Sequence, residues 1–136
     1  MKWATRPGIH VDRAASAWLI VRYVDVAAAF DYVEDLDDVS RDATPFDFVG
    51  CDLSHHGSDV TFETILRRYE LDDPVLWKIG EMVHEADVED GLFDVPEAAG
   101  FDMIIRALSS NRPDEEVRSL TAAILDSLEH QLRSGS

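Results

Sequence analysis

Histidines and carboxylates occur at two places in the chain with a spacing that suits metal coordination. One is the loop sequence His55-His56-Gly57, and the other is His84-Glu85-Ala86-Asp87 at the end of a predicted helix. Residues three apart on a helix lie on one face, one turn apart, so His84 and Asp87 can point at a common ion. A loop histidine after a strand is well placed as a third ligand. We therefore predict a metal site formed by His55, His84 and Asp87.

The ligand types indicate which metals are suitable and leave the role of the site open. Imidazole with carboxylate suits zinc, iron or manganese better than calcium or magnesium. Glu63, one turn into the next predicted helix, is the candidate for a fourth ligand or for a catalytic general base. Three protein ligands with open positions make a catalytic or substrate-binding site, whereas four make a structural one. The competing interpretation is an exposed helical pair at His84 and Asp87, with loop histidines that only cap the next helix.

Arginines near the start of the chain offer a second kind of chemistry. Arg6, Arg13 and Arg22 are candidates to converge on an anion, because guanidinium groups donate paired hydrogen bonds to oxyanions. Pairing with the abundant carboxylates is the alternative. Asp12 can cap the helix that follows it. The sequence has no G-x-S-x-G motif, no C-x-x-C motif and no phosphate-cradling glycine loop, so it does not favour a serine hydrolase or a nucleotide-binding protein.

The charge balance is strongly acidic. There are 28 acidic residues against 12 basic ones, which gives a net charge of −16. This excess repels itself in dilute buffer, whereas molar salt shortens the Debye length to about 3 Å and screens the repulsion. We therefore predict a halophilic protein of a saline cytoplasm; an ordinary acidic protein, or one with a basic partner, is the alternative. The lack of basic clusters argues against direct binding to nucleic acid or to a membrane surface.

Length and residue usage indicate a single cytoplasmic domain. The chain has 136 residues, of which 46% are hydrophobic, enough for one core and too few for two. No apolar run approaches the roughly 20 residues that span a bilayer, and the N-terminus does not have the pattern of a secretory signal. The one cysteine, Cys51, agrees with a reducing compartment. We predict one domain over residues 1–133 and a disordered tail at 134–136.

Hydrophobic periodicity predicts an α+β fold that is mainly helical, with about five helices and a few short strands. Strands are expected at 2–6, 29–34 and 46–49, and the acidic segment 35–44 is expected to be a loop or short helix. The helices are expected at 12–25, 60–70, 73–87, 95–109 and 113–132. This order places the histidine loop directly before the second helix.

With these residues in view, the sequence resembles the C-terminal domain of the chromate-resistance protein B family over roughly residues 3–103. The matching segments are Trp3-Ala4-Thr5-Arg6, Val11-Asp12-Arg13, Trp18-Leu19-Ile20, Arg22-Tyr23-Val24-Asp25, Pro45-Phe46-Asp47, Gly50, His55, Gly57, Thr61-Phe62-Glu63, Tyr69, Leu71, Asp73, Leu76, Val83-His84, Asp87 and Pro96-Glu97-Ala98-Ala99-Gly100. The first three segments and the V-H-x-x-D block are specific in combination.

The resemblance implies a domain linked with chromate resistance. In longer members it is fused to an N-terminal regulatory region or a rhodanese-like sulfurtransferase module, whose roles are not carried over. The polar positions that carry over are Arg6, Asp12, Arg13, His55, Glu63, His84 and Asp87. Among these, Arg6, Asp12 and Arg13 are expected to bind the ligand or to orient the groups that do. Many members have cysteine where this chain has Ser16 and Val60, so thiol chemistry on chromate is not expected here.

Together these observations predict a divalent-metal-binding domain of the chromate-resistance type that acts on or senses a small oxyanion. The alternative is a non-catalytic anion-sensing or protein-interaction module without metal. Whether the domain is an enzyme stays open at this point. The expected partner is a small molecule or oxyanion, and a homodimer is a further option.

Overall fold

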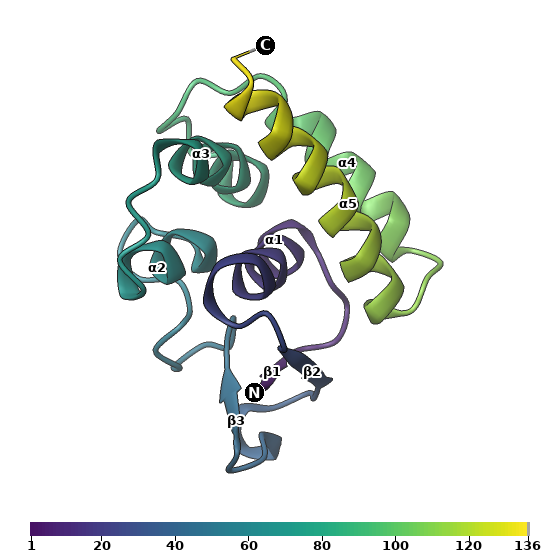
Figure 1. Cartoon of the computed structure of the whole chain (residues 1–136). Coiled ribbons are helices and arrows are strands. Elements are labelled where there is room, and N and C mark those ends of the chain that lie inside the picture. Colours follow the sequence, from purple (N-terminus) through teal and green to yellow (C-terminus); the bar gives the residue numbers. More distant parts are fainter. Residues whose placement is uncertain (136) are drawn as a thin grey trace.

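The computed structural model describes residues 1–135, in which five α-helices pack beside a small three-stranded sheet (Figure 1). This confirms the predicted α+β class with helices dominant. The elements in chain order are β1 (Lys2–Thr5), α1 (Val11–Leu19), the π-helical turn η1 (Ile20–Val24), β2 (Ala29–Tyr32), the 3₁₀ turn η2 (Leu36–Asp38), β3 (Ala43–Pro45), α2 (Thr61–Arg68), α3 (Pro74–Val88), α4 (Ala98–Ser109) and α5 (Asp114–Arg133).

Among the helices that the structure describes, none is both long and apolar enough to cross a bilayer. After α5, Ser134 and Gly135 continue into a turn whose amides bond back to His130 and Leu132. Ser136 lies outside the described residues, so the disordered tail at 134–136 stays a prediction.

The sheet is parallel, in the order β2-β1-β3, with β1 in the centre. The strand predicted at 46–49 is wrong in position, because the third strand is β3, which overlaps the end of the segment 35–44 that was expected to be a loop or short helix. Asp47 has a left-handed backbone, with φ 59°, which ends the extended chain directly after Phe46. Pro45 is tolerated because β3 is an edge strand, where a missing N–H need not cost a ladder bond.

Helix α1 runs through the middle of the molecule, and all of its residues are buried. Helices α2 and α3 lie on one side of it, and the α4–α5 pair lies on the other (Figure 1). The single helix expected over 12–25 changes to π-helical hydrogen bonding from Ile20 to Val24. This turn presents Arg22 and Tyr23 to α5, where both bond to the Glu129 carboxylate.

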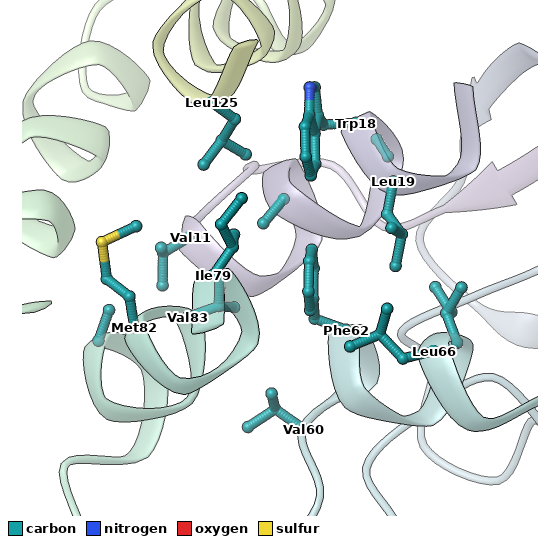
Figure 2. Packing of buried hydrophobic residues seen from close by; sticks show 14 of the residues in the cluster. Val11, Trp18, Leu19, Val60, Phe62, Leu66, Ile79, Met82, Val83 and Leu125 are labelled. Atoms are coloured by element: carbon teal, nitrogen blue, oxygen red, sulfur yellow. The ribbon is translucent and has the colours of Figure 1, made fainter. Parts of the chain in front are cut away.

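The core holds the first turn of α2 between two other helices. Phe62 of α2 stacks on Trp18 of α1, with ring centroids 6.5 Å apart and an interplanar angle of 6° (Figure 2). On α3, Gly80 faces the same phenyl ring, and a Cβ added there would lie 3.4 Å from Phe62. The neighbouring Glu63 is therefore carried on a turn that is packed from both sides.

Candidate functional site

The site is built around the N-terminus of α2. Val60, at the N-cap position, has no side-chain acceptor, so one carboxylate of α1 and one of α2 itself accept hydrogen bonds from the amides at this helix end. Asp12 of α1 accepts from the amides of Thr61 and Phe62, each at 3.0 Å. Glu63 accepts from the Val60 amide at 3.0 Å. The partial positive charge of a helix N-terminus stabilises both of these buried carboxylates.

His55 lies between two carboxylates, one of which is the Asp12 that caps α2. Its Nε2 is 3.0 Å from Asp12 Oδ2 and 3.3 Å from Asp87 Oδ2. Hydrogen bonds to Asp12 and then to Asp87 raise the pKa of His55 to about 10. Burial raises the pKa of Asp12 as well, against the opposing effect of its bond to His55. One ligand atom of each residue lies within 4.8 Å of the others, so the three can share one cation.

His84 forms a second group of the same kind. Its side chain is fully buried, and Nδ1 lies 2.7 Å from Glu63 Oε1. On the other side of the ring, Nε2 is 3.0 Å from both oxygens of Asp90 and 3.9 Å from Glu85 Oε2. Burial lowers the pKa of His84, but the hydrogen bonds to Glu63 and Asp90 outweigh it and the net shift is upward.

The predicted ligands His55, His84 and Asp87 do not meet at one point in the described part of the chain. Asp87 joins His55 and Asp12, whereas His84 belongs to the other group. Three residues along a helix leave about 60° between two side chains, and here that angle separates the buried His84 from Asp87, which is 25% exposed. Glu63 contacts His84 and caps α2 rather than facing His55. Its role as a ligand or general base stays a prediction.

The three arginines do not converge on one point, since Arg22 pairs with carboxylates of α5. Arg13 is buried and donates to Asp47 Oδ2 at 2.9 Å and to the carbonyls of Pro7 and Gly8. Arg6 donates to the Asp47 carbonyl and keeps 44% of its side chain exposed. Arg6 also lines a cavity of about 290 Å³. The cavity's other lining residues are Asp47, Phe48, Val49, Gly50, Ser54 and His55.

Sequence reasoning missed three residues of this region: Asp47, Glu85 and Asp90. Asp47 accepts from Arg13 and from the Thr61 hydroxyl, so it ties α1 to the start of α2. Its place between two phenylalanines had suggested a strand. Glu85 was visible beside His84, and Asp90 stands before a glycine in a turn signal after the helix. Neither signal shows that the chain folds back toward His84.

Comparison with known proteins identifies the family. The family model described as "ChrB, C-terminal domain" matches residues 3–132. This chain is a ChrB C-terminal domain. Protein ChrB of Cupriavidus metallidurans is 40% identical over 129 residues, which cover 93% of this chain and 39% of that protein. The ChrB-type domain described here thus spans about two fifths of that relative's length. No solved structure gives a significant match.

Proposed function

We propose that this ChrB-type domain binds a divalent metal ion, zinc, iron or manganese, through Asp12, His55 and Asp87. The observation that carries the proposal is His55 Nε2, which lies at 3.0 and 3.3 Å from two carboxylate oxygens. Two ligand atoms that are each about 2.1 Å from a tetrahedral ion lie roughly 3.4 Å apart. Small shifts of these side chains therefore make room for an ion in place of the shared proton.

The surroundings of this group suit an ion with an open coordination position. Asp12 is fixed by two backbone amides and is almost fully buried, while His55 is 46% exposed and forms the solvent side. Three protein ligands leave a position for water or substrate. When bound, the ion would act as a Lewis acid toward a small molecule that reaches it.

The cavity beside His55 supports a small oxyanion as the molecule that is bound or sensed. Arg6 and His55 line the same cavity of about 290 Å³. Arg6 has a partly exposed guanidinium group, which can donate to an oxyanion once its weak contact with Asp47 is given up. In a chain with a net charge of −16, the Arg6 guanidinium and the His55 imidazole on this wall, which also includes Asp47, are the features that favour an anion.

A second candidate function is an anion-sensing module that uses no metal. It is supported by the raised pKa of His55, which keeps the imidazole protonated at neutral pH beside Arg6. This candidate predicts that chromate or sulfate raises the melting temperature, whereas zinc, iron(II) and manganese leave it unchanged. The metal-binding function predicts stabilisation by at least one of the three cations, measured by the same thermal-shift assay.

The direct test compares two neighbouring histidines. His55 is a proposed ligand, whereas the exposed His56 bonds through its ring to the Asp52 carbonyl and belongs to neither metal-ligand group of the described residues. His55→Ala and His56→Ala are therefore matched variants. After metal loading and desalting, elemental analysis should show one equivalent of metal less in His55→Ala than in wild type, and no loss in His56→Ala. Equal metal content in all three proteins would refute the proposed function.

A further inference from the structure

The imidazole of His84 is held in the manner of a metal ligand. Its Nδ1 meets the Glu63 carboxylate at 2.7 Å, and Glu63 is itself held by the Val60 amide. Metal-binding histidines commonly donate one ring N–H to a carboxylate, which fixes the tautomer and the ring orientation. The Phe93 ring packs edge-on against the imidazole, with centroids 5.1 Å apart. With Nδ1 engaged by Glu63, Nε2 is the ring nitrogen that remains for coordination, and it faces Asp90.

Two further carboxylates face that nitrogen. Asp90 places both oxygens 3.0 Å from Nε2, and Glu85 Oε2 lies at 3.9 Å. These distances bracket the roughly 3.4 Å expected between two ligands of one tetrahedral ion. We propose that His84, Glu85 and Asp90 form a second divalent-cation site. It shares no ligand with the Asp12–His55–Asp87 group, so it does not rest on the function proposed above.

The backbone after α3 is folded so that it positions these carboxylates. Glu85 accepts from the amides of Gly91 and Phe93, at 2.9 and 3.1 Å. Asp90 accepts from the Leu92 amide at 3.1 Å. A carboxylate oxygen has two lone-pair positions, so an oxygen that accepts from an amide can still bind an ion. The Asp90 side chain is 43% exposed and forms the side through which an ion enters.

A purely structural role for the same group makes a different prediction. An imidazolium shared by Glu63 and Asp90 would hold the segment 89–93 without any ion. In that case zinc would neither bind there nor slow hydrogen exchange at the Gly91 and Phe93 amides. The two roles therefore differ in stoichiometry and in local protection, and both can be measured without an enzyme assay.

The test titrates ZnCl₂ into chelator-stripped protein by isothermal titration calorimetry. Asp90→Asn removes a ligand at a partly exposed position, and Asp94→Asn is the matched control, since Asp94 is exposed and outside both groups. We expect Asp90→Asn to bind one zinc ion per chain fewer than wild type and Asp94→Asn, which is one against two when the Asp12–His55–Asp87 group also binds. Zinc should also slow exchange of the Gly91 and Phe93 amides in wild type but not in Asp90→Asn.

The outcomes separate this site from the first one. If Asp90→Asn binds as much zinc as wild type, with unchanged affinity, the second site is overturned. If wild type binds one ion and only His55→Ala loses it, the second site is overturned while the proposed function stands. If wild type binds one ion that Asp90→Asn loses and His55→Ala keeps, the second site stands and the first fails.

Discussion

Replacing Asp12 by alanine should destabilise the fold as well as remove a proposed ligand. The substitution leaves the buried amides of Thr61 and Phe62 without an acceptor. Each of these two unsatisfied donors costs about 1–3 kcal/mol, and this already includes the loss of the helix N-cap, for which about 0.5–2 kcal/mol is typical. Part of this is offset, because burial already disfavours the charged form of the Asp12 carboxylate, whose pKa is raised. We expect a net loss of about 2–4 kcal/mol in the free energy of unfolding.

Urea denaturation of the metal-free protein measures this loss, and thermal melting should show a drop of roughly 6–15 °C for a domain of this size. Asp12→Asn keeps one oxygen acceptor, so it should fall between wild type and Asp12→Ala. Asp38→Ala removes the same charge at an exposed position and should change the stability by less than about 0.5 kcal/mol. An Asp12→Ala protein as stable as Asp38→Ala would refute the assignment of Asp12 as the cap of α2.

Three further outcomes can be checked on the same protein. Gly80→Ala should raise the free energy of unfolding, measured by urea titration, by about 0.5–1 kcal/mol, because alanine is the better helix former. Its Cβ would lie 3.4 Å from Phe62, which is a van der Waals contact. Gly80→Leu should instead destabilise the protein by overpacking the same space. With a chelator present, the hydrogen bonds of protonated His55 to Asp12 and Asp87 should contribute fully to the free energy of unfolding below about pH 6.5, the pKa of histidine in the unfolded chain. This contribution should decline as the pH rises toward about 10, the pKa of His55 in the folded protein. A His55→Gln protein whose stability has the same pH dependence as that of His56→Gln would contradict this. The melting temperature should rise from low to molar KCl, because salt screens the net charge of −16, and an unchanged value would contradict salt adaptation.

The helices were predictable because their boundaries are encoded locally. Prolines mark the starts predicted at 73 and 113, and the structure begins α3 at Pro74 and α5 at Asp114. The third strand was not, because Phe46 and Phe48 alternate with Asp47 as a strand would. In the structure Asp47 has a left-handed backbone, and its carboxylate accepts hydrogen bonds from Arg13 and Thr61, which are distant in sequence. Local pattern carries no information about such partners.

The chemistry of the candidate site was predictable in kind but not in grouping. The spacing of His84 and Asp87 placed both near one face of a helix; in the structure His84 contacts Glu63 of α2, and Asp87 contacts His55 of the loop before α2. His84 pairs with the buried carboxylate of Glu63 through Nδ1. Asp87 instead meets His55, which also bonds to Asp12, a residue 43 positions earlier in the chain. These pairings arise only when α1, α2 and α3 pack together.

Because Asp12 of α1 caps the N-terminus of α2, the site can form only in a chain in which both helices have folded together. The acceptor for the Thr61 amide lies 49 residues earlier in the chain. A fragment that begins after α1 would retain His55, His84 and Asp87, yet it would lack both Asp12 and the Trp18 surface that seats Phe62. Ion affinity should therefore appear together with global cooperative folding, and peptides covering the histidine motifs alone should bind no better than unstructured controls.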